Sequence, residues 1–284
     1  MVRAWSRHER RWRDNRYVYA VVSRRSRGVS IGINLNPGKE CNFDCIYCQV
    51  DRKITPEIRR VNLEKLAGEL DLILDAERDG SLYAEEPFNI LAKAERGIRD
   101  IAFSGDGEPT AFPRFEDAVR IAAAARSRFG LFSAKLVLIT DAAFLRKPRV
   151  SSALRLLDQN NGEIWAKLDA GTEEYFQQVN RPNVPLETIL ENILDAARVR
   201  PVVIQSLWLR IEGAAPPTEE VEAYCARLNW VVSSGGKIRT VQLYTIARNP
   251  AEPSASPLTN EELDQIASAV ISKVPVPLET FYAS

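Results

Sequence analysis

The feature that most constrains the fold is a regular alternation of strand-like and helix-like patterns. Apolar runs typical of strands occupy residues 29–36, 100–104, 135–140, 163–170, 202–209 and 237–246. Helical spacing of apolar residues follows them at residues 62–79, 115–128, 148–159, 187–199 and 217–232, and in a last helix after Thr259. Such alternation implies a parallel sheet with right-handed crossovers. Six units rather than eight predict an α/β fold with a partial (β/α)6 TIM-like barrel.

Weaker local patterns complete this prediction. Thr259 and Glu262 form a capping box for the last helix. A further strand is expected at residues 17–23, a short helix near residues 88–95, and an extended tail from Pro275. We expect two parts, a basic N-terminal arm of residues 1–28 and a barrel of residues 29–284 with its C-terminal helix and tail.

Three cysteines, Cys41, Cys45 and Cys48, stand close together just after the first barrel strand. Thiolate sulfur suits iron–sulfur clusters, zinc and copper(I). A cubane cluster usually takes four cysteines, so three would leave one iron without a protein ligand. A structural zinc site needs four ligands, and the remaining candidates are only Cys225 and His8, neither in a paired spacing. A disulfide is a weaker interpretation of these cysteines than a zinc site, because nothing in the chain indicates an oxidising compartment.

The pattern CxxxCxxC, with Tyr47 just before its last cysteine, resembles the radical S-adenosylmethionine (radical SAM) enzymes. The resemblance covers residues 29–273 and implies the same partial barrel. It implies that Cys41, Cys45 and Cys48 are metal ligands of a [4Fe-4S] cluster, and that S-adenosyl-L-methionine is the second cofactor. It also implies an oxidoreductase or transferase that cleaves S-adenosylmethionine reductively and removes a hydrogen atom from its substrate. Lys39, beside the loop, is either a charge that raises the cluster's potential or a solvated side chain.

A second informative stretch is Gly105-Asp106-Gly107-Glu108-Pro109-Thr110, directly after a strand. Glycines let a backbone approach a ligand closely, and a carboxylate can pair with an ammonium group. The stretch is similar to the family's glycine-glycine-glutamate motif, except that Asp106 replaces the second glycine. The resemblance implies that Gly105, Gly107 and Glu108 bind the methionine part of the cofactor.

Polar residues follow or interrupt three other strands. The residues that we expect to bind the cofactor or substrate there are Thr140, Asp141, Lys167, Asp169, Gln205 and Ser206. The alternatives are solvated strand ends, a structural Lys167–Asp169 ion pair, and internal hydrogen bonds. Lys167-Leu168-Asp169-Ala170-Gly171, with Asn180-Arg181-Pro182 after it, resembles an Fe-S oxidoreductase subgroup related to wyosine-forming tRNA-modifying enzymes.

Composition limits the partners only weakly. The 38 basic and 38 acidic residues give no net charge, although arginines crowd residues 1–28. That arm either holds RNA or packs over the barrel. No apolar run could cross a bilayer and residues 1–13 lack a signal-peptide core, so we expect a cytoplasmic protein without a membrane partner.

The resemblance implies an electron donor such as flavodoxin or ferredoxin, and a substrate that RNA or a nucleoside could supply. The tRNA-modifying relatives carry a second cluster, for which only Cys225 is left here. A glycyl-radical activating enzyme and a non-catalytic zinc or Fe-S binding protein are the alternative functions.

Overall fold

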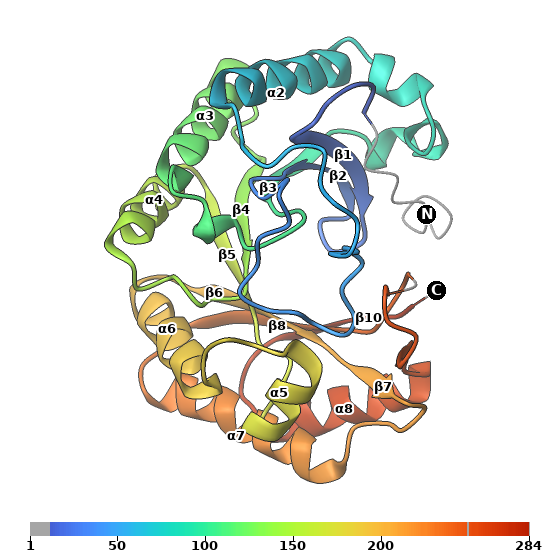
Figure 1. Cartoon of the computed structure of the whole chain (residues 1–284), viewed down its shortest axis with the longest axis vertical. Helices are drawn as coiled ribbons and strands as arrows, with labels where there is room; N and C mark the ends of the chain where they lie inside the picture. The colour runs from blue at the N-terminus through green and yellow to red at the C-terminus, as the bar shows by residue number, and fades with distance from the viewer. Residues whose placement is uncertain (1–11, 249, 284) are drawn as a thin grey trace. The chain divides into compact units, whose positions relative to one another are not determined.

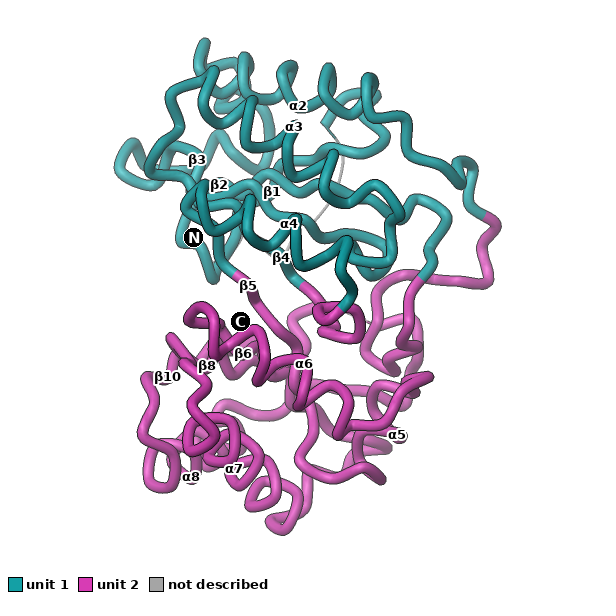
Figure 2. Tube along the Cα trace, turned by 90° about the vertical axis from the view of Figure 1, so that its left-hand side faces the viewer, with its two compact units in different colours: residues 1–40, 56–139, 147–163 teal, residues 41–55, 140–146, 164–284 magenta. Residues whose placement is uncertain are grey.

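The computed structural model (Figure 1) describes residues 12–248 and 250–283. It divides into two compact units (Figure 2). Unit 1 comprises residues 1–40, 56–139 and 147–163, and unit 2 comprises residues 41–55, 140–146 and 164–284. Both units are therefore discontinuous in sequence. Residues 1–11 of the predicted basic arm, and His8 with them, lie outside the described residues.

Unit 1 is built on the strands β1 (Val18–Ser23), β2 (Gly28–Ile33), β3 (Ile98–Phe103) and β4 (Lys135–Thr140). β1 pairs antiparallel with β2, whereas β2, β3 and β4 pair parallel in sequence order. All of β2 is buried, as expected for a parallel strand covered on both faces. The helices that lie along one side of these strands (Figure 1) are α2 (Leu63–Arg78), α3 (Phe115–Arg128) and α4 (Pro148–Asp158).

Within unit 2 the strand order is β5-β6-β8-β10. Its parallel strands are β5 (Gly162–Lys167), β6 (Val202–Leu207), β8 (Ile238–Tyr244) and β10 (Leu278–Phe281). Its helices are α5 (Glu173–Asn180), α6 (Leu186–Val199), α7 (Thr218–Ser233) and α8 (Asn260–Lys273). β7 (Leu209–Ile211) and β9 (Ala255–Pro257) form a separate antiparallel ribbon.

The described residues contain the predicted succession of strand–helix units, namely β2–α2, β3–α3, β4–α4, β5–α6, β6–α7 and β8–α8. The predicted strand at residues 17–23 is β1. The capping box is also present, because the Glu262 N–H donates to Thr259 Oγ1 at 3.2 Å and the Thr259 N–H to Glu262 Oε2 at 2.8 Å. The α/β prediction is therefore confirmed.

Three elements differ from the prediction. Residues 88–95 form two short 3-10 segments, η2 (Phe88–Ile90) and η3 (Lys93–Glu95), rather than one helix. α5 was not predicted, because its eight residues include too few turns to show a clear apolar period. The tail is extended as predicted, but it also pairs with β8 as strand β10.

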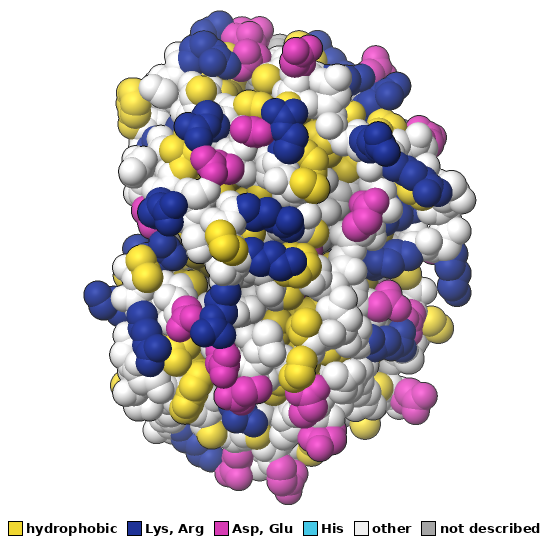
Figure 3. Space-filling view, turned by 60° about the vertical axis from the view of Figure 1, so that its left-hand side comes forward, with side chains coloured by type: hydrophobic (Ala, Val, Ile, Leu, Met, Phe, Trp, Pro, Cys, Tyr) yellow, Lys and Arg dark blue, Asp and Glu magenta, His cyan; other side chains and the backbone are white. Residues whose placement is uncertain are grey.

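Charged side chains of both signs are interspersed over the face shown in Figure 3. Within unit 1, the Arg120–Glu116 ion pair joins neighbouring turns of α3, and Arg114, at the N-terminal cap of this helix, pairs with Asp117. Each such exposed pair contributes about 0.3–0.5 kcal/mol. Among the described helices, none combines the length and the apolar character needed to span a bilayer.

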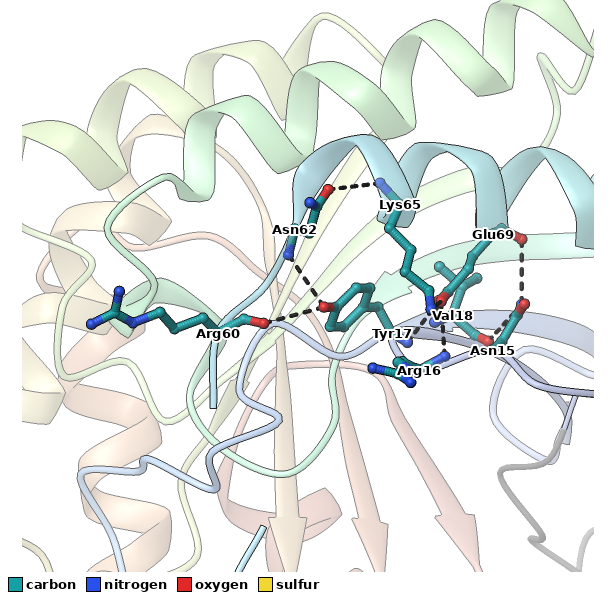
Figure 4. Close-up of polar contacts among 8 residues, drawn as sticks. All are labelled: Asn15, Arg16, Tyr17, Val18, Arg60, Asn62, Lys65 and Glu69. Atoms are coloured by element: carbon teal, nitrogen blue, oxygen red, sulfur yellow. Dashed lines mark hydrogen bonds and ion pairs between the residues drawn. The ribbon is translucent and has the colours of Figure 1, made fainter. Parts of the chain in front are cut away.

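The start of β1 is held by one buried carboxylate, that of Glu69 on α2 (Figure 4). Glu69 Oε1 accepts a hydrogen bond from the Arg16 N–H at 2.9 Å. Glu69 Oε2 accepts from the N–H groups of Tyr17 at 2.7 Å and Val18 at 3.1 Å. Three consecutive backbone donors thus bind one side chain, which fixes where the edge strand begins.

Replacing Glu69 by alanine should lower the free energy of unfolding by about 2–4 kcal/mol, because three buried or half-buried N–H groups would lose their acceptor. Chemical denaturation of the purified chain measures this loss. The matched control is Glu64→Ala on the same helix, whose side chain is exposed and whose loss should cost no more than about 0.5 kcal/mol. Equal effects of the two substitutions would contradict the anchoring role of Glu69.

Candidate functional site

The cysteine loop, residues 41–55 of unit 2, forms no helix or strand. Its backbone is fixed by the end of α5. The Asp44 N–H donates to the Asn180 carbonyl at 3.0 Å and the Ile46 N–H to the Val179 carbonyl at 2.9 Å. The ring of Phe43 also packs edge-on against Phe176 of α5, with centroids 5.3 Å apart. The loop therefore takes its conformation from a helix that lies far away in the sequence.

The three cysteines differ in exposure. Cys41 is exposed, whereas Cys45 and Cys48 are half-buried and share a turn in which the Cys48 N–H donates to the Cys45 carbonyl at 2.9 Å. In the part of the chain that the structure describes, no cluster of three or more Cys, His, Asp or Glu side chains is arranged around a single ion position. Cys225 is buried on α7 as a small core residue.

The donor set nevertheless fits a cubane cluster. Each thiolate of such a cluster binds a different iron, so the sulfurs need not converge on one point. Three soft sulfur ligands lie within eight residues of one loop, and two of them already receive N–H donors. Arg52 Nη1 lies 3.3 Å from Cys48 Sγ, and Asn180 Nδ2 lies 3.4 Å from Cys45 Sγ. These contacts suit sulfurs that carry negative charge.

The electrostatics of the loop are governed by burial and by one lysine. Loss of hydration raises the pKa of Cys45 to about 12, and the positive charge of Lys167 opposes this rise. Burial would lower the pKa of Lys167, but Tyr244, Asp169 and Cys45 together raise it above its ordinary value. Lys167 therefore stays protonated beside the thiol.

A buried polar network joins the loop to the ends of β5 and β6. Lys167 Nζ donates to the Tyr47 hydroxyl at 2.9 Å, and that hydroxyl donates to Asp169 Oδ2. Asp169 Oδ1 accepts from the Leu207 N–H at 2.8 Å. Lys167 and Asp169 are thus connected through the aromatic residue that precedes the last cysteine. A direct Lys167–Asp169 ion pair was one of the two alternatives for these residues; here the Tyr47 hydroxyl stands between the two side chains.

The glycine-containing turn lies in unit 1, at the end of β3. A Cβ on Gly107 would stand 1.8 Å from the backbone carbonyl oxygen of Glu40, so only glycine fits there. The Glu108 N–H donates to that same carbonyl at 3.3 Å. Glu40 directly precedes Cys41 in the sequence, so the turn is bonded to the residue from which the cysteine loop starts.

Asp106 stands where the glycine-glycine-glutamate pattern has its second glycine. Its hydrogen-bond partner is Asn34, which directly follows β2. Asn34 Nδ2 donates to Asp106 Oδ2 at 2.6 Å, and the Asp106 N–H donates to Asn34 Oδ1 at 3.2 Å. Glu108 is buried, and its Oε1 accepts from the Thr110 N–H at 3.0 Å and from the Thr110 hydroxyl. Asn34 and Thr110 therefore fix the two carboxylates of the turn.

Thr140 and Asp141 form a tight turn after β4. Thr140 Oγ1 accepts from the Ala142 N–H at 3.0 Å, and Asp141 Oδ1 accepts from the Ala143 N–H at 2.9 Å. Ala142 has a φ of 67°, a left-handed conformation that L-residues other than Asn and Asp rarely adopt. Asn192 of α6 holds it through a bond of 2.9 Å to the Ala142 carbonyl.

Gln205 and Ser206 lie on opposite faces of β6 and use internal partners. Gln205 Nε2 donates to Gln242 Oε1 at 2.8 Å, and the register places Lys167, Gln205 and Gln242 in one row across β5, β6 and β8. The Ser206 hydroxyl bonds the Tyr224 hydroxyl of α7 at 2.5 Å. Gln205 therefore lies in the same row as Lys167, whereas Ser206 faces α7.

The family follows from a match over most of this region. The sequence model of the Radical SAM superfamily matches residues 35–212, which contain the cysteine loop, the glycine turn and the predicted site residues on β4, β5 and β6 and in the segments that follow β4 and β5. The chain belongs to the radical SAM superfamily. Members of this superfamily are enzymes, and the family implies a [4Fe-4S] cluster and S-adenosylmethionine as cofactors.

Individual proteins are similar to this chain in sequence or in fold. A UPF0026 protein of Helicobacter pylori is 25% identical over 248 residues, which are 87% of this chain and 71% of that protein. A radical SAM methyltransferase from Sphaerobacter thermophilus has a similar fold, with a TM-score of 0.64 at 14% identity over 93% of this chain and 69% of that one. An archaeal TYW1 structure gives a TM-score of 0.50 at 14% identity over 88% of this chain and 73% of that one. The predicted partial-barrel fold and family resemblance are thus confirmed.

Two residues of the radical SAM chain that touch the cysteine sulfurs were not predicted as site residues. Arg52 follows the motif without any periodic pattern, and Asn180 ends a helix that was not predicted. The only sequence signal for Asn180 is the run Asn180-Arg181-Pro182, which was noted for its family resemblance alone. The Tyr244 hydroxyl lies 3.3 Å from Lys167 Nζ. The sequence predicted Tyr244 only as a strand residue, not as a site residue.

Replacing Gly107 by alanine should destabilise the protein, because the new Cβ would overlap the Glu40 carbonyl and force the turn apart. We expect a loss of about 1–3 kcal/mol in the free energy of unfolding. The same substitution at Gly68, in the interior of α2, has open space around it and should stabilise the protein by about 0.5–1 kcal/mol. Thermal and denaturant melts of both variants would show opposite signs; a stabilised Gly107→Ala protein would contradict the described packing.

Proposed function

We propose that this protein binds a [4Fe-4S] cluster through Cys41, Cys45 and Cys48 and uses it to cleave S-adenosylmethionine reductively. The observation that carries the proposal is the hydrogen bond from the Glu108 N–H to the Glu40 carbonyl, one peptide unit before Cys41. This bond ties the motif proposed for the methionine part to the start of the motif proposed for the cluster. A structural metal loop would need no such link.

When bound, the two cofactors supply a one-electron reduction and a hydrogen-atom acceptor. The chain's own residues supply binding and orientation. The three cysteines provide soft thiolate ligands. Gly105 and Gly107 allow close backbone approach, and Glu108, held by Thr110, offers a carboxylate to the ammonium group of the methionine part.

We further propose that Lys167 and Asp169 lie next to the bound cofactors, because the Tyr47 hydroxyl connects both to the cysteine loop. Thr140 and Asp141, in a rigid strand-end turn, and Gln205, in the same row as Lys167, are proposed to contribute to the same environment. For Ser206 the structure adds no support to the sequence-based prediction, because its hydroxyl forms a hydrogen bond with the Tyr224 hydroxyl.

A flavodoxin or ferredoxin is the electron donor that we propose as a partner. The subgroup resemblance favours RNA or a nucleoside as the substrate. Cys225, buried on α7, is too isolated to build the second cluster of the tRNA-modifying relatives. We therefore propose a reaction that needs only one cluster, in a cytoplasmic setting.

Anaerobic reconstitution with iron and sulfide tests the cluster. The wild-type chain should gain the broad visible absorbance of thiolate-to-iron charge transfer, and Cys45→Ala should lose it because the cluster would lack one of its three ligands. Cys225→Ala is the matched control and should keep the absorbance. Zinc in the purified protein together with no visible band would contradict the proposal and favour a structural zinc site.

Product analysis tests catalysis. The reduced, reconstituted protein should release 5′-deoxyadenosine from S-adenosylmethionine, and a non-catalytic binding protein should release none. Glu108→Gln keeps the shape of the side chain but removes its charge, so binding of S-adenosylmethionine should weaken about tenfold or more. Glu64→Gln, an exposed carboxylate on α2, should leave binding unchanged. Unaltered affinity in Glu108→Gln would remove Glu108 from the proposed site.

A further inference from the structure

Two N–H donors reach the sulfurs of the proposed cluster ligands from different parts of unit 2. Asn180 Nδ2 lies 3.4 Å from Cys45 Sγ, and Arg52 Nη1 lies 3.3 Å from Cys48 Sγ. Both distances are within the range of a hydrogen bond to sulfur, whose atomic radius exceeds that of oxygen. Neither residue belongs to the cysteine motif, and neither is needed to complete the ligand set.

The amide of Asn180 is held with its nitrogen toward the sulfur. Asn180 is almost fully buried, and its Nδ2 also donates to Asp169 Oδ2 at 2.9 Å. Asp169 Oδ2 also accepts from the Tyr47 hydroxyl, so a flipped amide would set two acceptor oxygens against each other. Asp169 is itself fixed by the Leu207 N–H. The chain Leu207–Asp169–Asn180–Cys45 therefore sets the direction of the donor.

The backbone around Asn180 fixes its distance from the loop. The Asn180 carbonyl accepts from the Asp44 N–H, the residue before Cys45, and the Val179 carbonyl accepts from the Ile46 N–H, the residue after it. These two bonds flank Cys45. Its sulfur and the Asn180 amide are consequently held in register by the main chain rather than by the side chains alone.

Arg52 brings a full positive charge to the other sulfur. Its guanidinium is half-buried, and Nη1 also lies 3.8 Å from Asp44 Oδ1. Arg52 thus bridges the loop from the turn after the motif back to the residue before Cys45. Because the guanidinium is always protonated, the contact to Cys48 is charge-assisted.

Hydrogen bonds to thiolate ligands change the reduction potential of an iron–sulfur cluster. One-electron reduction makes the cluster more negative by one charge, and N–H donors stabilise the more negative form more strongly. Donors at two of three ligands therefore make reduction easier. The adjustment matters most when the electron donor is only slightly more reducing than the cluster.

We propose that Asn180 and Arg52 are positioning residues that, through N–H···S bonds to Cys45 and Cys48, raise the reduction potential of the cluster. This inference rests on the proposed function, since it requires the cluster to be bound. It assigns to the Asn180-Arg181-Pro182 segment the role of orienting an N–H donor toward a cluster ligand. It also places the potential-raising charge at Arg52, in contact with sulfur, and not at Lys39.

The test is a potentiometric titration of the reconstituted full chain, followed by the electron paramagnetic resonance signal of the reduced cluster. Asn180→Ala and Arg52→Leu should each shift the midpoint potential to a more negative value, and the double variant should shift it further. Arg52→Lys keeps the charge without the planar fork and should fall between wild type and Arg52→Leu. Iron content and thermal melts of each variant show that the cluster and the fold persist.

Two matched controls separate the contacts from general effects. Lys53→Leu removes the same charge one residue away, from an exposed side chain, and Asn183→Ala removes an exposed amide three residues after Asn180. Both should keep the wild-type potential. Wild-type potentials in Asn180→Ala and Arg52→Leu would overturn the inference, and so would a shift in Lys53→Leu as large as that in Arg52→Leu.

The remaining outcomes are also decisive. If Asn180→Ala holds no cluster, the comparison of Arg52→Leu, Arg52→Lys and Lys53→Leu decides the inference for the charged donor, and Asn180 is reassigned to loop structure alone. If the wild-type chain itself forms no cluster, the proposed function fails, and this result differs from a normal cluster with unshifted variants.

Discussion

The structure of the site depends on the hydrogen bonds between the cysteine loop and the C-terminal end of α5. A loop without regular structure has no internal pattern of backbone bonds, so its N–H groups must find partners elsewhere. Here the carbonyls of Val179 and Asn180 supply them to Ile46 and Asp44. The last carbonyls of any helix lack an intrahelical donor, which makes them natural acceptors for another segment. This junction, the pair of hydrogen bonds between the loop and the end of α5, fixes the position of the cysteine loop.

The same junction connects residues that sequence patterns treat as unrelated. Tyr47 and Asp169 are 122 positions apart, yet the Tyr47 hydroxyl donates to the Asp169 carboxylate. Lys167 and Asn180 complete the network around that hydroxyl and the Cys45 sulfur. A buried network of this kind is stabilising only when its members satisfy one another. The polar ends of β5 and β6 thus help to support the cysteine loop.

How far the sequence predicts the molecule depends on whether a feature is local. The capping box at Thr259 and Glu262, the strand at residues 17–23 and the helix of residues 115–128 are encoded by neighbouring residues, and all three are present. α5 was missed because its length falls below what periodicity can resolve. The contacts of Asn180 and Arg52 with sulfur could not be predicted, since they depend on loop geometry. Asp106 departs from the family's motif. Its carboxylate has a structural role, because it accepts a hydrogen bond from Asn34, which follows β2.

The division of the chain into units affects the order in which the cysteine loop and its partners are synthesised. Residues 41–55 belong to unit 2, although they are flanked in sequence by segments of unit 1. Their backbone partners at Val179 and Asn180 are translated more than a hundred residues later. Because N-terminal segments emerge from the ribosome first, the loop must leave the exit tunnel without its acceptors. The loop therefore lacks the backbone bonds that flank Cys45 until α5 has been synthesised.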